Sequence, residues 1–121
     1  GGDDLQSLDC GGRPLYLRVA EMVAGDWSQR GECGLVVGAT YPDELRAVRE
    51  AAGDLPILVP GIGAQGGDPQ AAVASGATAD GRGLIVSSSR AIIYASSDDD
   101  FADAARAAAI EARLATLPSG W

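Results

Sequence analysis

Apolar residues along the chain follow two different spacings, and each spacing predicts one kind of element. Short unbroken apolar runs, bounded by glycine or proline, are typical of strands that are buried on both faces. Such runs occupy residues 34–38, 56–60 and 83–86. Apolar residues at helical spacing predict helices over residues 14–29, 42–52, 68–75 and 101–114, with a further helical turn at 91–95.

The order of these elements indicates the fold class. Residues 42–52 form the best delimited helix: Asp43 and Glu44 lie in its first turn, and Gly53 follows its last residue. Residues 1–13 are expected to form a loop, and helices and strands alternate along the rest of the chain. This alternation is typical of parallel βα units, so we predict an α/β fold with a parallel sheet.

Three parallel strands are few for such a fold. An open sheet of three parallel strands leaves two apolar edges without a partner, and a closed (β/α)₈ barrel needs roughly 250 residues. The chain has 121 residues. It forms either an unusually small open sheet or part of a larger fold, and we favour the second interpretation.

The charge balance excludes some partners. The chain has 9 basic and 17 acidic residues, a net charge of −8. Nucleic acids and anionic membranes are held through excess positive charge, so neither is expected as a partner. The sequence has no pattern typical of a signal peptide or a membrane-spanning helix, so we expect a cytoplasmic location. All nine basic residues are arginine, so the chain itself supplies neither a lysine amine nor an imidazole.

The two cysteines, Cys10 and Cys33, do not indicate a metal site. A structural zinc site needs four nitrogen or sulfur ligands, and the chain has no histidine. We therefore expect no metal ion. A disulfide between the two cysteines is one possibility, and two separate thiols are the alternative that we favour.

The strongest candidate for a binding site is the loop at residues 60–68, between a predicted strand and a predicted helix. Four of its nine residues are glycine, which lets backbone amides approach a ligand closely. The helix N-terminus behind the loop adds the positive end of a dipole, and the two features together suit an anion such as a phosphate. The alternative is a tight βα turn without a ligand, but such a turn does not need the glutamine at its apex, Gln65.

The same loop matches the glycine spacing of dinucleotide-binding folds at Gly61, Gly63 and Gly66. In those folds the glycines open the helix itself, and an acidic residue follows about 20 residues later, after the next strand. Here the helix begins only after the last glycine, and Asp80 comes too early and before the strand. We therefore disfavour a dinucleotide site.

A second candidate feature, Ser89-Arg90, follows the third predicted strand. The arginine guanidinium presents a fixed fork of donors that matches phosphate oxygens. If the last two strands belong to a barrel, their loops lie where barrel enzymes commonly bind phosphate. An exposed arginine in a surface salt bridge is the alternative.

Three segments, in this order, resemble motifs of one known family: LVVGATYP at residues 35–42, LVPGIGAQGGD at 58–68 and SRAIIYA at 89–95. They resemble the ends of the sixth, seventh and eighth strands of the orotidine 5′-phosphate decarboxylase family, most closely its longer bacterial branch. The DLQ segment at residues 4–6 also resembles the segment directly after that family's fifth strand. The resemblance covers the chain to its last helix, near Leu117.

The resemblance implies the C-terminal portion, about strands six to eight with their helices, of a TIM (β/α)₈ barrel. It also implies a homodimer when complete, a nucleotide substrate, orotidine 5′-monophosphate, and its cofactor-free conversion to uridine 5′-monophosphate and carbon dioxide in pyrimidine biosynthesis. The resemblance also implies that Gln65 bridges the phosphate and the pyrimidine of the substrate. The substrate-binding residues implied by the motifs are Pro60, Gly61, Ile62, Gly63, Gln65, Ser89 and Arg90.

One departure from the family is large. The family's reaction centre is an Asp-x-Lys-x-x-Asp array with a further lysine, and this chain contains no lysine. We therefore expect no catalytic residue in residues 1–121. We also expect the N-terminal barrel strands to come from outside these residues. Two other functions stay open: a different phosphate-binding barrel enzyme, such as an isomerase or synthase of small phosphorylated metabolites, or a non-catalytic module that binds a phosphorylated ligand.

Overall fold

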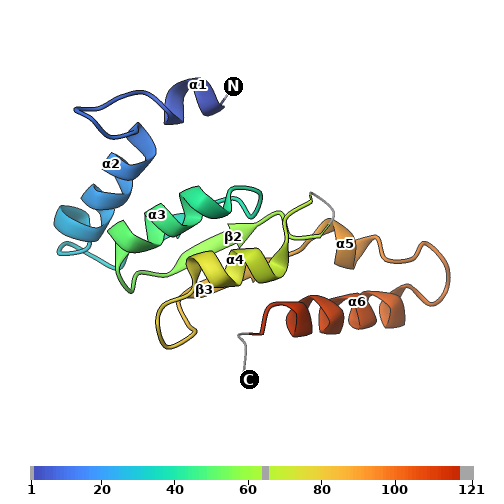
Figure 1. The fold of residues 1–121 in the computed structure, drawn as a ribbon. Helices are drawn as coiled ribbons and strands as arrows, with labels where there is room; N and C mark the ends of the chain where they lie inside the picture. Colours follow the sequence, from blue (N-terminus) through green and yellow to red (C-terminus); the bar gives the residue numbers. More distant parts are fainter. Residues whose placement is uncertain (1, 64–65, 118–121) are drawn as a thin grey trace.

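The computed structural model describes residues 2–63 and 66–117, and its centre is a parallel sheet of three strands (Figure 1). The strands are β1 (Leu35–Val36), β2 (Ile57–Pro60) and β3 (Leu84–Ser87), in the order β1-β2-β3. Both pairs of strands are parallel, so the predicted α/β class and strand direction are confirmed. β1 is shorter than the run of apolar residues from which it was predicted.

Helices flank the strands along the chain. They are α1 (Gly2–Gln6), α2 (Leu15–Met22), the π-helical turn η1 (Val23–Trp27), α3 (Pro42–Ala52), α4 (Pro69–Gly76), α5 (Arg90–Ile93) and α6 (Phe101–Ala115). The predicted helices at 42–52 and 101–114 are confirmed. The expectation of a loop over residues 1–13 is wrong for α1, whose first turn contains Asp3 and Asp4, where acidic side chains favour a helix.

The core lies between one face of the sheet and the helices α2, α3 and α4. Figure 1 shows α3 and α4 side by side across this face. Ile57 and Val59 of β2 are fully buried there against Leu45 of α3. Gly76 of α4 permits this close packing, because a Cβ at that position would lie 2.9 Å from the Leu45 side chain.

The opposite face of the sheet is apolar and open. Val36, Leu58 and Ile85 lie in register across the three strands, and side chains alternate between faces along a strand. Val36 is 66% exposed and Ile85 is 57% exposed. The expectation that the strands are buried on both faces is therefore wrong, because the described helices cover only one face.

A buried arginine holds together the end of the sheet at which β2 and β3 begin. Arg49, on α3, is only 8% exposed. Its guanidinium donates to four backbone carbonyl oxygens, those of Gly53, Leu55, Gly76 and Gly83, at 2.6–2.9 Å. Burial lowers the pKa of Arg49 from its ordinary value, and the nearby Asp54 carboxylate opposes this shift. One side chain thus fastens the last turns of α3 and α4 to the starts of two strands.

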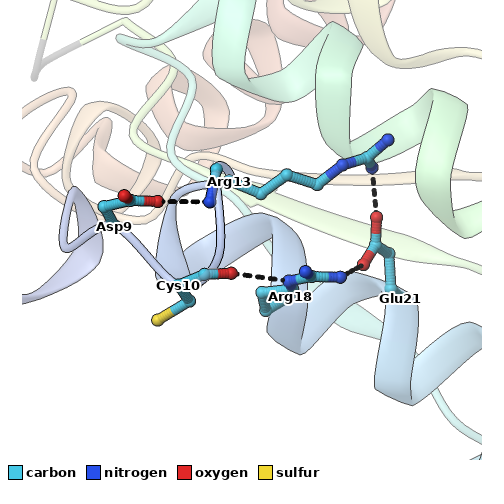
Figure 2. Close-up of polar contacts among 6 residues, drawn as sticks. Asp9, Cys10, Arg13, Arg18 and Glu21 are labelled. Atoms are coloured by element: carbon cyan, nitrogen blue, oxygen red, sulfur yellow. Dashed lines mark hydrogen bonds and ion pairs between the residues drawn. The ribbon is translucent and has the colours of Figure 1, made fainter.

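Polar contacts fasten the turn before α2 to that helix (Figure 2). Arg18 donates from Nε to the carbonyl oxygen of Cys10 at 2.9 Å and pairs with Glu21 at 3.1 Å. Arg13 also pairs with Glu21, and the Gly12 amide donates to Asp9. Pro14 stands just before α2 as its N-cap rather than at its first helical position. This network is partly exposed, so it orders the turn without forming a buried charge cluster.

Candidate functional site

The carboxyl ends of β2 and β3 lie side by side because the two strands are parallel, with Pro60 paired to Ser87 as the last residues of the ladder. A small cavity of about 100 Å³ opens at this point. It has room for about three water molecules, so it fits a phosphate-sized group rather than a whole nucleotide. Its lining consists of Pro60, Gly61, Ile62, Ser87, Ser88, Ser89 and Arg90.

Five of the residues singled out from the sequence therefore meet around one cavity: Pro60, Gly61, Ile62, Ser89 and Arg90. They come from segments that are about 30 residues apart in the chain. Gly63 does not line the cavity but lies directly beside it: a Cβ at that position would be 3.8 Å from both Ser88 Oγ and Ala91 Cβ. Gln65 lies outside the described residues.

The sequence motifs did not indicate two serines that line the cavity, Ser87 and Ser88. Ser87 ends β3, and Ser88 follows it and donates a hydrogen bond from Oγ to the carbonyl oxygen of Ile62, at 3.2 Å. The signal that could have found them is the run of three hydroxyl side chains directly after an apolar strand. Every residue of such a run lies at the edge of the sheet where ligands of α/β folds bind.

The glycines shape the loop through their backbone conformation. Gly61, Gly63 and Gly66 have φ angles of 93°, 79° and 85°, which side chains with a Cβ rarely adopt. Gly67 is required for space, because a Cβ there would lie 2.5 Å from Ala39 Cβ and 2.8 Å from the Gly61 carbonyl oxygen. Glycine is thus needed at these positions whether or not a ligand is bound.

The loop also uses several of its own amides. The N–H of Gly63 donates to the carbonyl of Gly67, that of Gly66 to Gly63, and that of Gly67 to Gly61. An anion that bound these three amides would have to replace hydrogen bonds within the loop. The lining side chains and the remaining backbone of the cavity are therefore its first available donors.

The helix N-terminus behind the loop is occupied, which corrects one expectation. Asp68 is the N-cap of α4, and its carboxylate accepts hydrogen bonds from the amides of Gln70 and Ala71 at 2.8 and 3.3 Å. Pro69 has no amide hydrogen to offer. The N-terminal amides of α4 thus already bind an anionic side chain, so they do not supply the positive end that the sequence suggested for a phosphate.

Arg90 is the first residue of α5, and its side chain is exposed at the rim of the cavity. Among the described residues no ion pair joins Arg90 to a carboxylate, so the surface salt bridge considered as the alternative is not found there. Ser89, just before it, accepts hydrogen bonds at its carbonyl from the amides of Ile92 and Ile93. The guanidinium thus stands on an ordered turn beside the glycine loop.

The carboxylate considered for a dinucleotide site lies elsewhere. Asp80 is in the turn before β3, at the opposite end of the sheet from the glycine loop. Its Oδ1 accepts a hydrogen bond from Thr78 Oγ1 at 2.5 Å, and this bond is the main cause that lowers the pKa of Asp80. The placement agrees with the argument from spacing against a dinucleotide site.

Neither a metal nor a disulfide is indicated in the part of the chain that the structure describes. Its cysteine and acidic side chains form no group of three that could hold a metal ion. Cys10 and Cys33 are separate free thiols, as favoured from the sequence. Within residues 2–63 and 66–117 no helix has the length and hydropathy needed to cross a membrane.

The chain was compared with known proteins. No family model matches it. It is 61% identical over 113 residues to an orotidine 5′-phosphate decarboxylase of Azoarcus sp. (strain BH72), covering 93% of this chain and 42% of the relative. It is 60% identical over 109 residues to one of Ralstonia nicotianae, covering 90% of this chain and 40% of the relative. The chain thus spans about two fifths of the length of these curated relatives.

Solved structures agree with this similarity. A UMP synthase of Leishmania donovani matches with a TM-score of 0.79 and 43% identity, over 95% of this chain and 25% of that one. An OMP decarboxylase of the same organism matches with a TM-score of 0.77 and 39% identity, over 96% of this chain and 43% of that one. The parallel βα units are thus part of a TIM-barrel architecture. In sequence and in fold, the chain corresponds to the C-terminal part of the orotidine 5′-phosphate decarboxylases.

Proposed function

We propose that this chain forms the phosphate-binding part of an orotidine 5′-phosphate decarboxylase, which converts orotidine 5′-monophosphate to uridine 5′-monophosphate and carbon dioxide. The observation that carries the proposal is the cavity at the carboxyl ends of β2 and β3. There the glycine loop and the Ser87–Arg90 corner meet around a space of phosphate size. The sequence identity of 55–61% to curated decarboxylases supports the same function.

Each part of the cavity has a role in this proposal. The Arg90 guanidinium pairs with two phosphate oxygens, a contact strengthened by charge on both partners. The backbone of Ser89 and Arg90, and amides near Gly61, complete the cradle from the other side. Gln65, outside the described residues, would reach from the phosphate to the pyrimidine. Because the phosphate is remote from the bond that breaks, its binding energy can be used to close the loop and align the reacting group.

The catalytic lysines of the family must come from outside residues 1–121, since the chain has none. The open apolar face formed by Val36, Leu58 and Ile85 supports a larger barrel, because covering such a face stabilises a sheet. We propose that N-terminal barrel strands cover it and carry the reaction centre. A homodimer of complete barrels and a cytoplasmic location belong to the same proposal.

The edge of β1 supports this arrangement. The amides of Leu35, Val37 and Ala39 donate to carbonyls of the β2 segment, so those of Val36 and Gly38 alternate to the other side. A groove of about 590 Å³ lies along this edge and is lined by β1, α1, α2 and α3. A further parallel strand would fit this groove and pair with the backbone of Val36 and Gly38.

A hybrid enzyme tests the proposed function. In this hybrid, the chain replaces the matching 113-residue region of the Azoarcus relative, which keeps its own N-terminal part. The expected result is decarboxylation of orotidine 5′-monophosphate. The reaction is measured as a decrease in absorbance while the substrate is consumed. A hybrid that folds, as judged by circular dichroism, but forms no uridine 5′-monophosphate would contradict the proposal.

A further inference from the structure

Ser88 stands between two cavities. It lines the small cavity of the proposed phosphate site, and it also lines a cavity of about 350 Å³ behind β3, between α4 and α6. Its side chain is half-buried. No role in phosphate binding follows from the motifs for this residue, since the decarboxylase resemblance points to Ser89 and Arg90.

The hydroxyl of Ser88 connects the two segments that form the proposed phosphate site. It donates to the carbonyl oxygen of Ile62, 26 residues away, at 3.2 Å. Among the described residues, no other side-chain hydrogen bond joins segment 60–63 to segment 87–90. Gly63 lies beside the same hydroxyl: a Cβ added at this position would be 3.8 Å from Ser88 Oγ.

The direction of this bond separates Ser88 from the groups that would contact a phosphate. A serine hydroxyl has one hydrogen to donate. Phosphate oxygens need donors, and the hydrogen of Ser88 is already used on Ile62. The bond also fixes the peptide between Ile62 and Gly63, whose carbonyl points to Ser88 and whose N–H donates to the Gly67 carbonyl. Ser88 thereby determines how the backbone of the glycine loop faces Arg90.

We infer that Ser88 is a positioning residue for phosphate binding: its hydroxyl holds the glycine loop at the correct distance and orientation from Arg90. This inference rests on the proposed function. A ligand held from two sides is bound tightly only when both sides keep their geometry to within about 0.5 Å. Without the bond, the two segments are joined only by the ladder that ends at Pro60 and Ser87, so the loop beyond Pro60 is less restricted relative to Arg90, and binding the phosphate then costs more entropy.

The hybrid enzyme and three variants of it test the inference. Ser88→Ala removes the hydroxyl. Ser88→Thr keeps it and adds a methyl group, for which the 350 Å³ cavity behind β3 has space. Ser28→Ala is the matched control, because Ser28 also donates from a part-buried hydroxyl to carbonyls, those of Ala24 and Gly25, but on η1. Dissociation constants for uridine 5′-monophosphate and for uridine are measured by NMR titration of each protein.

We expect Ser88→Ala to weaken nucleotide binding about three- to tenfold, the range for one hydrogen bond, and to leave uridine binding unchanged. Ser88→Thr restores nucleotide affinity, and Ser28→Ala changes neither constant. Unchanged nucleotide binding in Ser88→Ala, an equal loss for nucleotide and nucleoside, or no restoration by threonine overturns the inference. If the unsubstituted hybrid does not decarboxylate, the proposed function fails instead, so the two failures are distinguishable.

Discussion

The two ends of the sheet are built for different tasks. At the end where β2 and β3 begin, the buried Arg49 donates to four carbonyls and fixes the chain from α3 to β3. At the carboxyl end, the glycine loop bonds mainly to itself, Arg90 is exposed, and a small cavity stays open. Both ends use an arginine, but the Arg49 guanidinium is bound by backbone carbonyls, whereas that of Arg90 has no hydrogen bond or ion pair to any residue that the structure describes.

Stability and binding are thus assigned to opposite ends of the sheet. Barrel enzymes bind ligands at the carboxyl ends of their strands, whereas the opposite end serves stability. Substitutions at the two arginines should therefore act on different measurements: the free energy of unfolding for Arg49 and the affinity for phosphate for Arg90.

The first prediction has the largest expected effect and concerns catalysis, for which neither end of the sheet provides the family's lysine. The purified 121-residue chain is expected to form no uridine 5′-monophosphate from orotidine 5′-monophosphate above the buffer rate. The reason is the absence of lysine, since no residue of the family's type can protonate the developing carbanion. A sensitive product assay by liquid chromatography checks this. Turnover by the chain alone would show that its own residues suffice for the chemistry.

The second prediction concerns Arg49. Arg49→Met in the hybrid enzyme is expected to lower the free energy of unfolding by about 3 kcal/mol, because it leaves buried carbonyls without donors. Nucleotide affinity of the folded protein stays within about twofold, since the substitution lies at the other end of the sheet. Urea denaturation and nucleotide titration measure the two quantities.

A matched control is Arg46→Met, one turn earlier on α3. Arg46 is exposed; it pairs with Asp43 at 3.6 Å and donates one hydrogen bond to Ser75 Oγ at 3.3 Å, so its loss is expected to lower stability by about 1 kcal/mol, well below the effect at Arg49. Equal destabilisation by the two substitutions would remove the special role assigned to Arg49.

The third prediction concerns Arg90. Arg90→Ala in the hybrid is expected to weaken uridine 5′-monophosphate binding by about one to two decades, the range for a charge-assisted contact worth about 1.5–3 kcal/mol. Uridine binding and the melting temperature should stay unchanged, because the side chain is exposed and forms no ion pair among the described residues. Arg106→Ala, at an exposed position on α6, is the control. Equal losses for nucleotide and nucleoside would refute the role in phosphate binding.

The fourth prediction concerns Gln65. Gln65→Ala in the hybrid should leave the melting temperature nearly unchanged, because loop side chains contribute little to stability. It should lower kcat/KM by less than the Arg90 substitution, since an amide contact to phosphate lacks the charge of a guanidinium. Steady-state kinetics measure this. Unchanged kcat/KM would return Gln65 to the interpretation of a plain turn residue.

Local signals made much of the fold predictable. α3 was predicted with its bounds because Asp43, Glu44 and Gly53 mark its two ends within a few residues. That the segments at Gly61 and Arg90 meet was predictable for the same reason: each follows an apolar run closely, and parallel strands bring such positions together. Features contained in a short window of sequence could therefore be predicted.

Features that depend on distant partners were not predictable. The exposure of Val36 depends on which elements cover the second face of the sheet, and a run of apolar residues carries no such information. Nothing around Arg49 indicated its burial, since two of its carbonyl partners lie 27 and 34 residues away. The cap of α4 was predictable, because an aspartate directly before a proline is typical of a helix start, and Asp68 is its N-cap.

The most direct test of phosphate binding at the carboxyl end is an NMR titration of the ¹⁵N-labelled hybrid enzyme with uridine 5′-monophosphate, compared with uridine. The nucleotide is expected to shift the amide signals of segments 60–63 and 87–90 in a way that uridine does not, and to leave residues around Arg49 unchanged. Nucleotide-specific shifts that appear instead around Arg82 and Arg113, in the cavity behind β3, would contradict the account. So would the same shifts for nucleotide and nucleoside.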